Sequence, residues 1–160
     1  MSFIAQLARA ETRNDSMLCV GLDPDPSKFP GSWKDDASRI FDFCATIVDA
    51  TKDLVIAFKP QIAYFAAQRA EEQLERLIAH IHKVAPDVPV ILDAKRGDIG
   101  STAEQYAVEV FERYRADAVT LSPFARVCPC RSAPPASCCA CRSSPPGLEV
   151  RHSRIAPLPW

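Results

Sequence analysis

The chain has 160 residues, of which 48% are hydrophobic and 24% charged, and its formal net charge is −1. This length suits one domain with a proper core, and the composition excludes a disordered or fibrous chain for most of the sequence. Residues 1–125 hold 14 Lys and Arg against 19 Asp and Glu, which excludes the clustered basic surface of a nucleic-acid-binding protein.

The N-terminal segment and the apolar runs bear on localisation. Arg9, Glu11 and Arg13 leave no room for the apolar core of a signal peptide. No apolar run approaches the roughly 20 residues of a membrane span. We therefore predict a cytoplasmic protein that does not contact a membrane.

The first half of the chain alternates apolar runs with helical spacing. Residues 17–22 form an apolar run that predicts a strand, and Asp23 follows it before a proline-rich break. Apolar residues then recur at i, i+3, i+4 and i+7, which predicts a helix over residues 35–51. A second strand is expected at residues 54–58, directly before Lys59.

The second half repeats this alternation. Helical spacing predicts a helix over residues 63–84, and a strand is expected at residues 88–93. Ser101 and Glu104 have the spacing of a capping box, which predicts a third helix from there through Tyr114. A fourth strand is expected at residues 118–121.

Strands that are apolar without alternation suit a parallel sheet covered by helices, so the predicted class is α/β. A dinucleotide-binding open sheet would need a G-x-G-x-x-G turn after its first strand, and the chain has none. Polar side chains instead follow each strand: Asp23, Lys59, Asp93 with Lys95, and Ser122. They would converge on the mouth of a barrel.

The segment 93–98 places charges of both signs, D-x-K-x-x-D, directly after a buried strand. Alone, this pattern is as consistent with a solvated turn as with a site. Its position at the carboxyl end of a strand favours a site, because ligands of alternating α/β folds bind there.

Three segments, residues 18–25, 58–65 and 90–102, resemble the orotidine 5'-phosphate decarboxylase family in its longer bacterial subfamily. The resemblance covers about residues 1–124. It implies a (β/α)8 TIM barrel, here with about four βα units, and a homodimer without metal or organic cofactor. It also implies a carboxy-lyase that forms UMP from orotidine 5'-phosphate.

The resemblance, carried over residue by residue, implies two sets of site residues. The implied catalytic network is Lys59, Asp93, Lys95 and Asp98. The implied substrate-binding residues are Asp23, Ile99 and Thr102. Asp98 and Thr102 are implied to reach the site of the partner subunit.

Two other functions stay open at this point. Related barrels that act on sugar phosphates share the D-x-K-x-x-D pattern but use a metal ion. Residues 125–160 form a tail of different character, with five of the seven Cys and seven of the 14 Pro, so a non-catalytic zinc-binding fragment is the other alternative. We favour out-of-frame translation of a GC-rich gene as the origin of this tail, and expect it to be irregular.

Overall fold

The computed structural model describes residues 2–122, and the tail at 125–160 lies outside the described residues. Four parallel strands form the sheet: β1 (Cys19–Leu22), β2 (Ala57–Pro60), β3 (Ile91–Arg96) and β4 (Ala118–Leu121). β1 pairs with β2 and β3 with β4, while bridges from Phe58 to Val90 and from Gln61 to Asp93 join the two pairs. Strand order in space thus follows strand order in the chain, as in the wall of a barrel.

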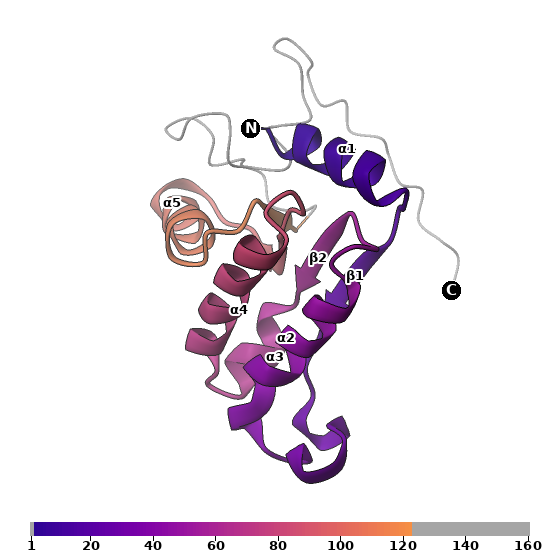
Figure 1. The fold of residues 1–160 in the computed structure, drawn as a ribbon. Coiled ribbons are helices and arrows are strands. Elements are labelled where there is room, and N and C mark those ends of the chain that lie inside the picture. The colour runs from indigo at the N-terminus through magenta and orange to yellow at the C-terminus, as the bar shows by residue number, and fades with distance from the viewer. Residues whose placement is uncertain (1, 123–160) are drawn as a thin grey trace, which may run out of the picture.

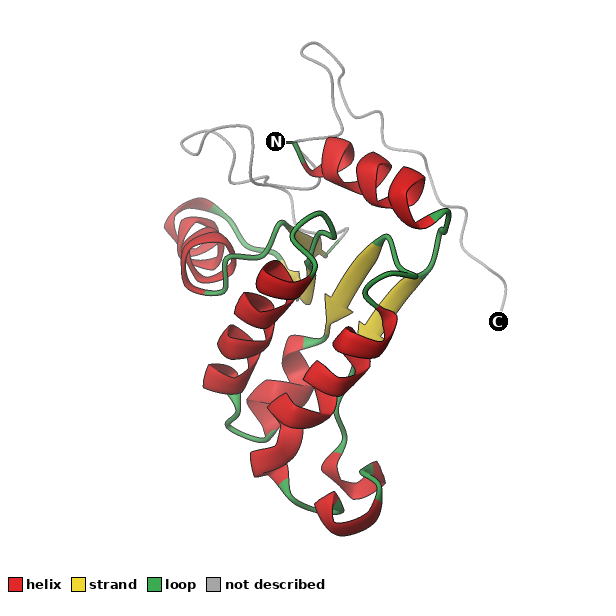
Figure 2. Ribbon diagram, in the orientation of Figure 1, coloured by secondary structure: helices red, strands yellow, loops and turns green. Residues whose placement is uncertain are grey.

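Helices precede, connect and cover these strands (Figure 1 and Figure 2). They are α1 (Phe3–Asn14), α2 (Ile40–Thr51), α3 (Ile62–Ala67), α4 (Glu71–Val84) and α5 (Gly100–Val108). Three 3₁₀ turns, η1 (Pro26–Lys28), η2 (Gly31–Trp33) and η3 (Ala37–Arg39), lead from β1 into α2, and a π-helical turn, η4 (Glu109–Arg113), follows α5. Every helix among residues 2–122 is too short or too polar to pass through a bilayer.

The core lies between the sheet and the paired helices α2 and α4, which run side by side in Figure 1. α4 buries one apolar stripe, Leu74, Leu77, Ile78 and Ile81, at the helical spacing read from the sequence. Each such side chain contributes roughly 1.5–3 kcal/mol relative to leaving it exposed. This packing fixes the strands, and the strand ends then position the polar residues.

Helix α1 closes the end of the sheet where the strands begin (Figure 1). Ser2 caps this helix by accepting a hydrogen bond from the amide of Ala5 at 3.3 Å. Asn14 Nδ2 donates to the carbonyl of Val55 at 2.7 Å, just before β2. Gln6 Nε2 donates to Asp117 at 3.4 Å, just before β4. The sequence patterns had not indicated this helix.

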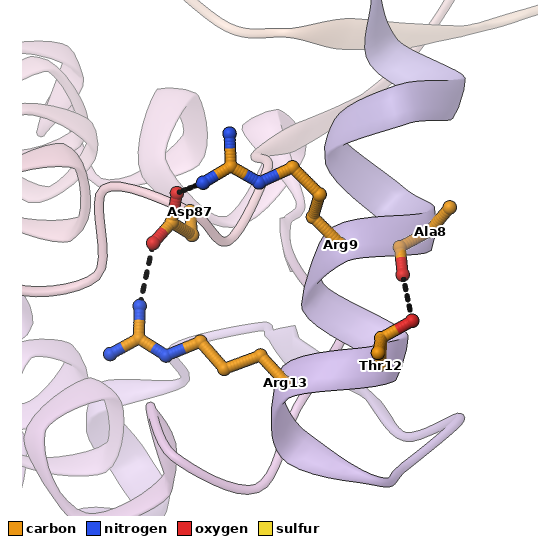
Figure 3. Close-up of a pocket in the computed structure, with 5 residues that line it drawn as sticks. All are labelled: Ala8, Arg9, Thr12, Arg13 and Asp87. Carbon is orange, nitrogen blue, oxygen red and sulfur yellow. Dashed lines mark hydrogen bonds and ion pairs between the residues drawn. The ribbon is translucent and has the colours of Figure 1, made fainter.

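A hollow of about 400 Å³ lies beside α1, lined by Ala8, Arg9, Thr12, Arg13 and Asp87 (Figure 3). Arg9 and Arg13 point from the helix to the two oxygens of Asp87, at 3.1 and 2.6 Å. Because the carboxylate already engages both guanidinium groups, we interpret the hollow as a docking contact of α1. It is remote from the charged strand ends.

Several predicted elements differ in their boundaries. The helix expected at residues 35–51 begins as α2 only at Ile40, after the 3₁₀ turn η3. The second strand was expected at residues 54–58 but spans Ala57–Pro60, because Leu54 lies exposed in the turn that ends α2. The helix expected at residues 63–84 is two helices, α3 and α4. The chain turns between them at Arg69, whose φ of 52° is left-handed and ends the first helix.

The third strand and third helix also need correction. The strand expected at residues 88–93 spans Ile91–Arg96, so Lys95 belongs to the strand and not to the loop. The capping box is wrong: α5 begins at Gly100, which places Ser101 inside the first turn, and no side chain caps the helix. The fourth strand has the predicted bounds, and the first is shorter by two residues.

Candidate functional site

Asp93 is the centre of the charged cluster at the carboxyl ends of the strands. Among residues 2–122 it is the one charged residue that is buried, with 7% of its surface exposed. Lys59 Nζ lies 2.9 Å from Oδ2, and Lys95 Nζ lies 2.6 Å from Oδ1. The hydroxyl of Thr120 donates to the same Oδ1 at 2.7 Å. One buried carboxylate thus meets two ammonium groups and a hydroxyl.

The sheet explains why these side chains meet. β2 and β3 are neighbours through bridges from Phe58 to Val90 and from Gln61 to Asp93. Lys59 therefore lies two residues before the level of Asp93, and its long side chain spans this offset to reach the carboxylate. Lys59 is paired with Gly21 of β1, two residues before Asp23. Asp93 and Lys95 both lie on β3, and the Lys95 ammonium group donates to Asp93 Oδ1 at 2.6 Å.

The cluster holds Asp93 in its charged form. Burial alone would raise the pKa of Asp93, but hydrogen bonds from Lys95, Thr120 and Lys59 outweigh it and lower the pKa well below its ordinary value. The hydrogen bond to Asp93 raises the pKa of Lys59 against the opposing effect of burial. Asp23 adds to this, since its negative charge also favours the protonated lysine.

Two predicted catalytic residues are drawn together with Asp93, and one is not. Lys59 and Lys95 contact the carboxylate directly, whereas Asp98 is exposed in the loop before α5. The Asp98 carboxylate accepts a hydrogen bond from the following amide, that of Ile99, at 2.8 Å. Its charge is therefore available at the surface of the chain.

The three predicted substrate-binding residues lie at two strand ends. Asp23 is exposed directly after β1. Ile99 is 64% exposed, unusually high for a large apolar side chain, and Thr102 is exposed in the first turn of α5. Ser122, expected to join the cluster, instead donates its backbone amide to the carbonyl of Arg96 at 2.9 Å.

Thr120 was missed by the reasoning from sequence. It lies within β4, one residue before the strand ends, and donates to Asp93 where Ser122 had been expected. The available signal was a single polar residue inside an apolar run, whose side chain alternates with Val119 and so faces Asp93.

Arg96 supports the outer side of β3. Its guanidinium makes two hydrogen bonds to Glu109, at 3.0 and 2.9 Å, and stacks over the Tyr106 ring with the centroid 4.8 Å away. Glu109 opens the π-helical turn η4, in which the amide of Tyr114 donates to the Glu109 carbonyl. Such turns often adjoin functional sites, because they present side chains that a regular helix would turn away.

The two histidines of α4 are structural. His80 Nε2 pairs with Asp49 at 3.0 Å, and His82 Nε2 pairs with Asp117 at 3.1 Å. Within residues 2–122, no three histidine, cysteine or acidic side chains come together as a metal site. The cysteines of the tail lie outside this range.

Known proteins resemble this chain in both sequence and fold. The family model for orotidine 5'-phosphate decarboxylase / HUMPS matches residues 16–128. Orotidine 5'-phosphate decarboxylase from Leptothrix cholodnii is 82% identical over 124 residues, which cover 78% of this chain and 44% of that protein. The protein of the same name from Methylibium petroleiphilum is 81% identical over 124 residues, covering 78% and 45%.

A solved structure of the same family has the same fold as the described residues. The OMP decarboxylase of Leishmania donovani superposes with a TM-score of 0.62 at 34% identity, over 76% of this chain and 44% of that one. The α/β fold is therefore that of the (β/α)8 barrel, of which the described residues provide the first four strands. The chain spans less than half the length of the curated relatives that it matches.

Proposed function

Because the chain belongs to the orotidine 5'-phosphate decarboxylase / HUMPS family, we propose that it carries the charged half of a carboxy-lyase site that converts orotidine 5'-phosphate to UMP and CO2. The observation that carries this proposal is the buried Asp93 carboxylate between the ammonium groups of Lys59 and Lys95. We propose residues 1–124 as the barrel portion that holds this network.

The reaction explains why an ammonium group is needed. Loss of CO2 from C6 of the pyrimidine leaves an electron pair on a carbon that has little resonance stabilisation. A cation fixed beside that carbon is stabilising chiefly in the transition state, where the charge develops, and therefore raises the rate. Lys95 suits this role, since 65% of its side chain is exposed while Asp93 holds its Nζ at 2.6 Å. It can then deliver the proton to C6.

Asp93 and Lys59 would set the field around Lys95. The Asp93 carboxylate would lie beside the substrate carboxylate and repel it, while it keeps Lys95 charged and oriented. Its lowered pKa supports this role, because the group stays ionised at neutral pH. Lys59 balances the charge, which avoids the large cost of an unpaired buried carboxylate.

The remaining residues would bind the substrate and complete the site across a homodimer. We assign Asp98 to the network of the partner subunit's site, together with Thr102. Ile99 would cover the pyrimidine, and Asp23 would bind the ribose. The exposure of Asp98, Ile99 and Thr102 on one short segment supports an interface there. We propose a cytoplasmic location, as for other enzymes of nucleotide synthesis.

The test is decarboxylation of orotidine 5'-phosphate by the 160-residue chain, followed as UMP formation. Lys95→Ala should abolish UMP formation, because it removes the exposed ammonium group proposed to lie beside C6, and Lys59 remains bound to the other oxygen of Asp93. Lys83→Ala is the matched control, since Lys83 is an exposed lysine in the last turn of α4, outside the charged cluster. Near-normal turnover by Lys95→Ala would refute the mechanism, and no turnover by the unmodified chain would refute the activity of this chain.

The competing functions give different results. A metal-dependent sugar-phosphate barrel would lose its activity on thorough chelation, whereas the proposed decarboxylase would keep it. A zinc-binding fragment would contain stoichiometric zinc when purified.

For residues 125–160 we propose out-of-frame translation, supported by their composition. Resequencing the gene tests this: family sequence restored in another frame supports it, and an intact frame refutes it.

A further inference from the structure

We propose that Thr120 is a positioning residue, whose hydroxyl fixes both the Asp93 carboxylate and the backbone of Lys95 in the geometry that the reaction needs. The proposal rests on the proposed function for its catalytic meaning. The structural part of the proposal rests on the hydrogen bonds of the Thr120 side chain.

The pairing of β3 with β4 is irregular at this point. Leu92 pairs with Val119, and Arg96 pairs with Leu121. The three residues 93–95 of β3 therefore lie opposite the single residue Thr120. Lys95 has a φ of 47°, a left-handed conformation that is rare for a residue with a side chain. A bulge of this kind redirects a side chain, and it leaves backbone groups without their usual partners.

The Thr120 hydroxyl supplies the missing partners. The amides of Ala94 and Lys95 both donate to its Oγ1, each at 3.1 Å. A hydroxyl has two lone pairs and one hydrogen, so these two amides use its accepting capacity. Its hydrogen is then directed at the third neighbour, Oδ1 of Asp93, at 2.7 Å. The direction of that hydrogen bond is thus set by the backbone of the bulge.

The consequence reaches Lys95 by two routes. Oδ1 of Asp93 accepts from Thr120 and from Lys95 Nζ, so fixing the carboxylate fixes the position of the ammonium group. The same hydroxyl holds the Lys95 amide, and so the left-handed backbone from which the side chain starts. Thr120 also contributes to the lowered pKa of Asp93.

Two variants separate the hydroxyl from the shape of the side chain. Thr120→Val keeps the β-branched shape and removes the hydroxyl, whereas Thr120→Ser keeps the hydroxyl. In hydrogen-exchange measurements, the amides of Ala94 and Lys95 should exchange about tenfold faster or more in Thr120→Val. They should remain protected in Thr120→Ser. The control amide is that of Val90, directly before β3, which donates to Asp117 at 2.9 Å and should not change.

A second measurement follows Asp93 itself. In a carboxyl ¹³C NMR titration, Asp93 should begin to protonate at higher pH in Thr120→Val than in the unmodified chain, and Thr120→Ser should restore the original titration. A residue that served only to stabilise the fold would not shift this titration. Thr120→Ala serves as a second variant without the hydroxyl, read in the same way, should Thr120→Val fail to fold.

Unchanged exchange and unchanged titration in Thr120→Val would overturn the proposal, as would rapid exchange of the Ala94 and Lys95 amides in the unmodified chain. With orotidine 5'-phosphate, Thr120→Val should lower kcat about tenfold or more, with little change in KM, because the misplaced charge acts in the transition state. Absence of turnover in the unmodified chain would contradict the proposed function alone, since exchange and titration report on Thr120 without substrate.

Discussion

Asp117 anchors the start of the β3 and β4 strand pair, and replacing it should destabilise the protein strongly. Its Oδ2 accepts from the amide of Val90 at 2.9 Å and from His82 Nε2 at 3.1 Å, and its Oδ1 accepts from Gln6 at 3.4 Å. A carboxylate can only accept, so the Nε2 of His82 must carry its hydrogen. Three elements, α1, α4 and β3, therefore meet at one side chain.

The cost of Asp117→Ala follows from these contacts. Val90 is fully buried, so its amide would lose its partner where water cannot replace it, at a cost of about 1–3 kcal/mol. The contacts to His82 and Gln6 are partly exposed and add about 1 kcal/mol together. The free energy of unfolding should thus fall by about 2–4 kcal/mol.

Asp49→Ala is the matched control for Asp117→Ala. Asp49 also pairs with a histidine of α4, His80, at 3.0 Å, but 51% of the Asp49 side chain is exposed and no buried amide depends on it. Such a pair contributes about 0–1 kcal/mol. Asp49 also lies in the last turn of α2, where a negative charge is unfavourable for the helix dipole. Urea unfolding at pH 7 measures both variants.

The pH dependence gives a second check on Asp117. Burial would raise the pKa of Asp117, but the contacts with His82 and the Val90 amide lower it overall. A carboxylate with a lowered folded-state pKa stabilises the protein above its unfolded pKa of about 3.9, and loses this contribution as the pH falls through the folded pKa. The difference between the unmodified chain and Asp117→Ala should therefore shrink below about pH 4. An Asp117→Ala cost no larger than that of Asp49→Ala would refute the reasoning.

Three further predictions concern the core, a thiol and the site. Leu77→Ala should lower the free energy of unfolding by about 2–5 kcal/mol in urea titrations, because Leu77 is fully buried. Cys44 should be alkylated much faster in denatured than in native protein, as mapped by mass spectrometry, because burial raises its pKa to about 12. The destabilisation by Asp93→Asn should likewise shrink below about pH 4 in thermal unfolding, since the pKa of Asp93 is lowered in the folded state.

The sequence predicted the alternation of the fold because each element buries one continuous apolar surface. The stripe of α4 and the run 118–121 match their predictions for this reason. The predicted element boundaries were wrong where the backbone conformation of a single residue determines them. The left-handed Arg69 divides one predicted helix into two, and no apolar pattern reports a positive φ at an arginine.

The candidate site was predictable as far as strand order determines it. Lys59, Asp93 and Lys95 converge because their strands are neighbours, and strand neighbours follow from the alternating pattern. Thr120 was not predictable in this way, because its role depends on a bulge that changes which residue lies opposite Asp93. A regular ladder would give the amides of residues 94 and 95 backbone partners and leave the hydroxyl without this function.

The same strand pair holds a buried or nearly buried carboxylate at each end, and the donors around each explain their different roles. Asp117 meets a backbone amide, an imidazole and a carboxamide, which fix neighbouring elements. Asp93 accepts from two ammonium groups and a hydroxyl, so its oxygens hold the charged ends of two lysine side chains in place. In a barrel the end where strands begin serves stability, and the end where they finish serves chemistry. On this pair of strands, the two ends differ in the donors that surround the carboxylate.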